Sequence, residues 1–138
     1  MTWLIYAFIS ALAAALTAIL AKIGVEGVPS TLATAIRTLI ITVFVWMIVA
    51  GLGEHRGLLS ISRRSLLFLV LSGLATGISW LAYFRALQLG PASRVAPIDK
   101  LSLPLTIVLA VVWLGEPIGL RAAVGVGLMA IGALLTLG

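Results

Sequence analysis

Five apolar stretches, each long enough to cross a bilayer, account for nearly all of this 138-residue chain. They run over residues 3–21, 31–51, 65–89, 92–114 and 119–137. A helix rises about 1.5 Å per residue and the hydrocarbon core is about 30 Å thick, so about 20 apolar residues span it. With 62% hydrophobic and 9% charged residues, the chain has too few polar groups to cover a soluble globule. We therefore predict an all-α, polytopic protein with five transmembrane helices, placed as a multi-pass protein in the cell membrane.

Short connections join the five predicted helices into one unit. Glycine and proline mark the breaks, as in Gly90-Pro91 and Gly115-Glu116-Pro117. We expect a single transmembrane domain over residues 1–138, in which neighbouring helices run antiparallel. The net charge of +5 comes from basic residues spread over helix ends and loops, which is a topological pattern. We therefore expect no nucleic-acid partner.

The basic residues near helix ends give only a weak orientation signal. The side that holds the N-terminus carries Arg56, Arg63, Arg64 and Arg121, and the opposite side carries two to four basic residues. The rule that cytoplasmic loops are positive then favours a cytoplasmic N-terminus by a small margin. So small a bias is compatible with a single orientation of the chain in the membrane. It also permits some copies to insert in the opposite orientation, and two such copies would form an antiparallel homodimer.

Three charged residues lie inside predicted helices rather than at their ends. Arg37 is about two turns into the second helix, and Asp99 and Lys100 are about two turns into the fourth, so all three share one depth. A charge at mid-membrane costs about 2.5–3.5 kcal/mol, so such residues normally face the protein interior and find partners. Because sequence neighbours on a helix point about 100° apart, we predict that Asp99 pairs with Arg37 rather than squarely with Lys100. The alternative is a purely structural ion pair, or side chains that reach toward the interface.

Two prolines interrupt the fourth predicted helix. Pro97 and Pro104 lack the amide donor of a helical hydrogen bond, which frees backbone groups near Ser93 and Lys100 unless neighbours or water satisfy them. A helix broken beside Asp99 and Lys100 is a candidate wall for a polar pathway. The alternative is that the prolines only shape packing.

A stripe on the third predicted helix is a candidate solute contact. Thr76, Trp80 and Tyr83 recur at helical spacing, with Leu87 one turn on and Phe84 on the flank. Such a stripe could line a cavity for an organic solute. The alternative for Trp80 and Tyr83 is an aromatic belt at the membrane interface.

Catalytic and metal-binding patterns are absent from the sequence. The single histidine, His55, lies in a predicted loop and the chain has no cysteine, so the spacing of a metal site is missing. Neither a nucleophilic triad at one depth nor a glycine-rich phosphate loop can be assembled. We therefore expect no enzyme, no metal and no cofactor.

Several segments of the chain resemble one family of membrane proteins. The run Tyr83-Phe84-Arg85-Ala86-Leu87, then ASRVAPIDK over residues 92–100, then Leu114-Gly115-Glu116, resembles the second part of an EamA-type domain of the drug/metabolite transporter superfamily. Residues 23–38, IGVEGVPSTLATAIRT, resemble the corresponding region of its small single-domain members. Members of the superfamily commonly have ten helices in two inverted five-helix repeats. The resemblance therefore implies one inverted-repeat unit, which needs a second copy.

The resemblance and the residues together lead to one hypothesis and two alternatives. We expect a homodimeric transporter that exports a small organic metabolite by alternating access, surrounded by membrane lipid, with its cavity between the two copies. The substrate-binding residues are predicted to be Arg37, Thr76, Trp80, Tyr83, Asp99 and Lys100. One alternative is a cation/proton antiporter like the small multidrug-resistance proteins, although residues 3–21 lack the acidic residue on which those depend. The other is a non-transporting subunit that binds a partner protein or lipid headgroups through Arg56, Arg63 and Arg64.

Overall fold

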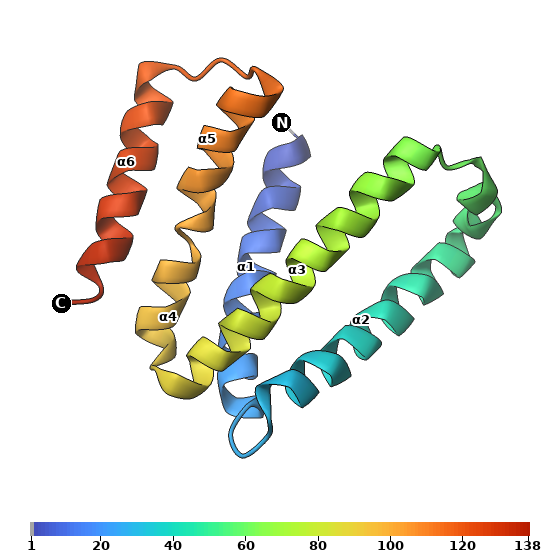
Figure 1. Ribbon diagram of the computed structural model, residues 1–138, viewed down its shortest axis with the longest axis horizontal. Helices are drawn as coiled ribbons and strands as arrows, with labels where there is room; N and C mark the ends of the chain where they lie inside the picture. The colour runs from blue at the N-terminus through green and yellow to red at the C-terminus, as the bar shows by residue number, and fades with distance from the viewer. Residues whose placement is uncertain (1) are drawn as a thin grey trace. The chain divides into compact units, whose positions relative to one another are not determined.

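The protein is built from helices joined by short connections (Figure 1). The computed structural model describes residues 2–138, and within that range it contains six α-helices, one 3₁₀ helix and no strand. In chain order the elements are α1 (Thr2–Gly24), α2 (Ser30–Leu52), the 3₁₀ helix η1 (Glu54–Ser60), α3 (Arg63–Leu89), α4 (Ala92–Asp99), α5 (Ser102–Leu114) and α6 (Leu120–Leu135). The all-α prediction is therefore confirmed.

In the part of the chain that the structure describes, four helical segments are long and apolar enough to cross a membrane. They are α1, α2, α3 and the stretch Ala92–Leu114, which α4 and α5 share. The sixth helix, α6, is apolar but has 16 residues, fewer than the about 20 that a full span needs. The predicted limits of the first three helices are within three residues of the observed ones. The predicted fourth helix is two helices, so residues 2–138 contain six α-helices rather than five.

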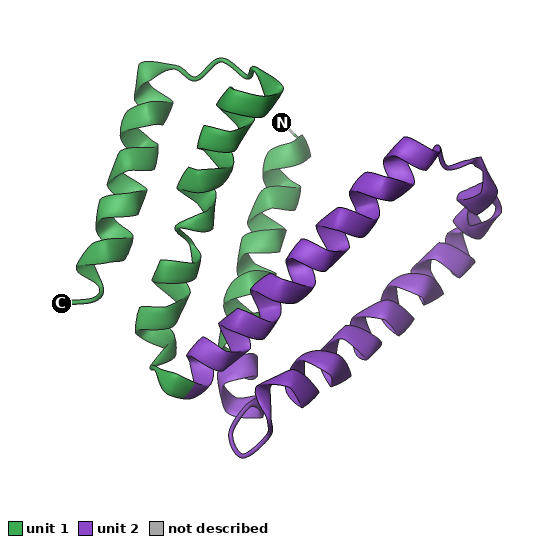
Figure 2. Ribbon diagram, in the orientation of Figure 1, with its two compact units in different colours: residues 1–19, 89–138 green, residues 20–88 purple. Residues whose placement is uncertain are grey.

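The residues form two compact units, which Figure 2 shows in different colours. Unit 1 consists of Met1–Ile19 and Leu89–Gly138, and unit 2 consists of Leu20–Gln88. Helix α1 therefore begins in unit 1 and ends in unit 2. In unit 1, α6 packs against both α4 and α5. The single domain expected over residues 1–138 stays a prediction.

The break between α4 and α5 follows from a proline. Pro104 has no amide hydrogen to donate to the carbonyl of Lys100, and the amide of Leu103 donates to that oxygen instead, at 3.0 Å. The amide of Leu101 likewise donates to the carbonyl of Ile98 at 3.0 Å, a step of three residues. The amide of Leu103 thus satisfies the Lys100 carbonyl. Hydrogen bonds over three residues replace those over four at this point, which is where the sequence predicted an interruption.

Unit 2 has a small buried core where the end of α1 meets the last turns of α3. Leu87 is fully buried there, and Val25 and Phe84 are each 2% exposed. By contrast, no residue is buried in the most apolar 18-residue stretch of each of the four spans. Apolar side chains on the spans therefore face outward, as they do when lipid is the solvent.

Candidate functional site

Arg37 of α2 lies against aromatic rings of α3, and both helices belong to unit 2. Its guanidinium carbon is 3.2 Å from the centroid of the Trp80 ring and 5.4 Å from that of Phe84. A cation over an aromatic face is attracted by the ring quadrupole, and the attraction grows when water is excluded. The sequence predicted that Arg37 and Trp80 serve one site, and the structure brings them into contact.

Three aromatic side chains of α3 form a cluster around this contact. The Phe84 ring is 6.1 Å from the Trp80 ring at 48° and 6.3 Å from the Tyr83 ring at 73°, measured between centroids and ring planes. Phe84 is 2% exposed, whereas Trp80 and Tyr83 are partly exposed. Offset and edge-on contacts of this kind are the favourable ones for aromatic rings. The buried Phe84 ring therefore holds the two partly exposed rings in place.

Within unit 2 the guanidinium of Arg37 forms no hydrogen bond and no ion pair, and it interacts electrostatically with Tyr83. None of the buried side-chain nitrogen and oxygen atoms of the same residues lacks a partner, so the Arg37 nitrogens are accessible rather than sealed. The ring contacts thus hold the cation while its N–H donors remain available.

Asp99 and Lys100 form their ion pair in unit 1. The Lys100 Nζ is 3.3 Å from Oδ2 of Asp99, and the two side chains are 53% and 32% exposed. The prediction that Asp99 does not pair squarely with Lys100 assumed a continuous helix, whereas α4 ends at Asp99 and the long Lys100 side chain extends from the C-cap. The predicted pairing of Asp99 with Arg37 joins residues of different units and stays a prediction.

The remaining members of the α3 stripe divide between surface and core. Thr76 is exposed, and its hydroxyl donates to the carbonyl of Ser72 at 2.9 Å, so its oxygen can still accept a hydrogen bond but its proton is already used. Leu87, which the spacing placed on the same stripe, is fully buried and belongs to the core of unit 2. The part of the stripe available to a solute is therefore Thr76, Trp80 and Tyr83.

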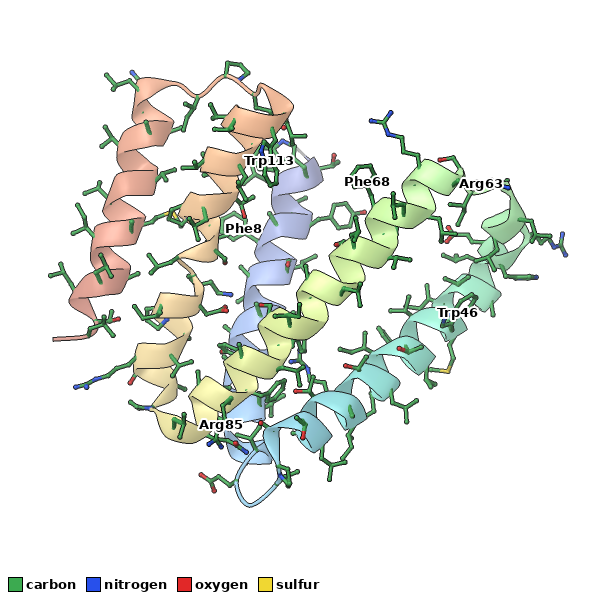
Figure 3. All side chains as sticks on the ribbon, viewed as in Figure 1. Phe8, Trp46, Arg63, Phe68, Arg85 and Trp113 are labelled. Atoms are coloured by element: carbon green, nitrogen blue, oxygen red, sulfur yellow. The ribbon has the colours of Figure 1, made fainter. Side chains whose placement is uncertain are left out.

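Gln88 joins the turn between α1 and α2 to the end of α3. Its Nε2 donates to the carbonyls of Val28 at 2.6 Å and Val25 at 3.3 Å, and its Oε1 accepts from Arg85 at 3.2 Å. Figure 3 shows Arg85 near this end of α3. No sequence pattern singled Gln88 out, and the available signal was that Gln88 is the only amide side chain in the sequence and lies in the last turn of a spanning helix.

Gln88→Leu should destabilise the protein by about 1–3 kcal/mol, because the carbonyls of Val25 and Val28 lose a donor and an apolar side chain cannot replace it. Unfolding in detergent, followed by circular dichroism, measures the change. Arg85→Gln is the matched control, since it removes only the bond to the Gln88 oxygen and should cost less than about 1 kcal/mol. Equal losses in the two variants would contradict a clamp made by the Gln88 amide.

Comparison with known proteins adds the family. The model of the EamA-like transporter family matches residues 1–138. The chain belongs to this family. A relative from Sinorhizobium sp, named "Uncharacterized transporter in cobO 3'region", is 51% identical over 134 residues, which cover 97% of this chain and 95% of the relative. No solved structure matches the chain.

Family membership confirms the resemblance read from residues 23–38 and 82–116 and makes this EamA-like protein a multi-pass membrane transporter. Its apolar helices contact lipid. The six predicted substrate-binding residues form two groups, with Arg37, Thr76, Trp80 and Tyr83 in unit 2 and Asp99 and Lys100 in unit 1. Their role in binding a solute stays a prediction.

Proposed function

We propose that this EamA-like protein exports a small organic metabolite by alternating access, with the solute site between two copies of the chain. The observation that carries the proposal is the stack of Arg37 on Trp80 between two membrane-spanning helices. A charged side chain within a span is costly, and in membrane proteins such residues mark solute and ion pathways. Trp80 and Tyr83 then contact the organic body of the solute, with Thr76 as an acceptor beside them.

A second copy supplies what a single repeat lacks. In transporters made of inverted repeats, solute binds near the midplane where the repeats meet, and one repeat rocks against the other. The Sinorhizobium relative is matched over 95% of its length, so it too is about one repeat long. The small excess of basic residues on one side is compatible with antiparallel copies. These features support a homodimer as the transporting form.

The break between α4 and α5 is the point at which we expect the Ala92–Leu114 span to move during transport. The Ala92–Leu114 span is interrupted after Asp99, and the ion pair of Asp99 with Lys100 lies at the interruption. Discontinuous helices at membrane depth are typical of transporter sites, which they form at the interface between repeats. Asp99 and Lys100 are therefore assigned to coupling or to charge preference, next to a point at which the span can bend.

Reconstitution into liposomes tests the proposal. We expect cross-linked dimers, movement of at least one solute from a panel of amino acids, sugars and organic acids and amines, and at least a ten-fold lower rate for Asp99→Asn. That substitution leaves Lys100 without its counter-charge inside a span. Glu116→Gln is the matched control, because Glu116 is exposed in the connection between α5 and α6, and it should transport like the unaltered protein.

Both alternatives predict a different result. Intact dimers that move nothing across the panel would contradict transport and favour the subunit that binds lipid headgroups through three exposed arginines, Arg56 of η1 and Arg63 and Arg64 at the start of α3. Proton-driven movement of cations alone would favour the small multidrug-resistance type. The sequence of α1 opposes that type, because its only charged residue is Lys22 and it has no carboxylate.

A further inference from the structure

Arg37 has no counter-charge inside unit 2. The acidic residues of that unit are Glu26 and Glu54, which lie outside the spans, whereas Asp99 and Lys100 of unit 1 form an ion pair of their own at 3.3 Å. Arg37 keeps its full positive charge, because a guanidinium is not deprotonated in proteins. A charge inside a span is unfavourable without a counter-charge. Unit 2 therefore supplies no anion for this cation.

The contact with Trp80 leaves the guanidinium ready for a planar anion. The ring covers one face of the group at 3.2 Å, and the N–H donors lie at its edge. Those donors have no hydrogen-bond partner within unit 2 and are accessible. A guanidinium offers a rigid fork of donors that matches a carboxylate or a phosphate through two parallel hydrogen bonds. A stacked, immobilised fork loses little freedom when it binds such a group.

We infer that the solute is an organic carboxylate whose oxygens are bound by Arg37 and whose apolar body lies along Trp80 and Tyr83. This inference rests on the proposed function and names the substrate class of the same site. It assigns the fork of Arg37 to the acid group and the partly exposed rings to the body of the solute. A lipid phosphate has the same oxyanion chemistry, so the test separates a free solute from a lipid headgroup.

Three probes with one apolar body and different charges test the inference. They are 3-phenylpropionate, 3-phenylpropylamine and 3-phenyl-1-propanol, titrated calorimetrically into the full chain in phosphatidylcholine nanodiscs. We expect the carboxylate to bind most tightly, and Arg37→Gln to weaken it by about ten- to a hundred-fold. Arg37→Lys keeps the charge but loses the fork, so it should weaken binding by a smaller factor. Arg121→Gln, at an exposed position in the first turn of α6, is the matched control and should change nothing.

Several results would contradict the carboxylate site. Equal or tighter binding of the amine or the alcohol, no binding of the carboxylate, or an unchanged affinity in Arg37→Gln overturns the inference. Should Arg37→Gln fail to fold, Arg37→Lys decides, because an unchanged affinity there contradicts a forked contact. Displacement of the carboxylate by dihexanoylphosphatidylcholine in phosphate-free maltoside micelles identifies a lipid phosphate as the partner and also overturns the inference.

Transport is measured separately, so the two proposals fail differently. Carboxylate binding that depends on Arg37, in a protein that moves no solute, contradicts the proposed export and leaves the anion site standing. Movement of an amine that is indifferent to Arg37→Gln contradicts the anion site and leaves transport standing.

Discussion

Trp80→Leu should lower solute transport at least ten-fold and destabilise the protein by about 2 kcal/mol. The substitution removes the ring that lies 3.2 Å from the Arg37 guanidinium, and cation–π contacts contribute about 2 kcal/mol when they are shielded from water. Leucine keeps the position apolar, so insertion into the membrane is retained. Arg37 then lacks both the attraction and the surface that holds its donors, which is why transport falls further than stability alone explains.

Flux into liposomes and unfolding in detergent measure the two effects of this substitution. Trp80→Phe keeps a ring over the cation and should give a smaller loss of both. Trp113→Leu is the matched control. It removes the same ring at a position on α5 where Trp113 is 77% exposed (Figure 3). A double-mutant cycle with Arg37→Gln should give a coupling energy of about 1–2 kcal/mol. Additive effects would contradict a stabilising contact between the two side chains.

Hydropathy and length predicted the helices of this protein well, because lipid leaves few choices for the backbone. Inside a bilayer the N–H and carbonyl groups must be satisfied within the segment, so an apolar stretch of about 20 residues becomes a helix. The limits of α1, α2 and α3 follow directly. The break in the fourth stretch, and its place beside Lys100, were predictable from Pro97 and Pro104, but the hydrogen bonds around it were not. They depend on which neighbouring amides replace the lost bonds, such as the amide of Leu103 that donates to the carbonyl of Lys100.

The candidate site was predictable only in part. A span that is apolar on all sides does not reveal which of its faces points toward the neighbouring helices. Spacing placed Trp80 and Tyr83 on one face of α3 and identified Arg37 as costly in lipid. It could not bring Arg37 to Trp80, since that contact depends on the rotation of α2 and α3 about their axes. The same limit explains why Leu87 was placed on the solute stripe, although it is fully buried.

Phe84→Ala should cause the largest loss of stability, about 2–4 kcal/mol. In soluble proteins a buried phenylalanine truncated to alanine costs about 3–5 kcal/mol, from lost transfer energy plus the cavity that remains. In a membrane the separated helices still lie in an apolar solvent, so part of the transfer term is lost and packing carries the rest. Phe84 is 2% exposed and contacts the Trp80 and Tyr83 rings, so nearly all of its packing would be lost.

Phe68→Ala on the same helix is the matched control for this loss. Phe68 is 59% exposed on α3 (Figure 3), so lipid or detergent fills the space of the missing ring and the cost should stay below about 1 kcal/mol. Detergent unfolding followed by circular dichroism compares the two variants. Because Phe84 also supports the Trp80 ring under Arg37, its truncation should weaken carboxylate binding, whereas Phe68→Ala should not. Similar losses in both variants would mean that the buried face of α3 neither stabilises unit 2 nor orients the cation.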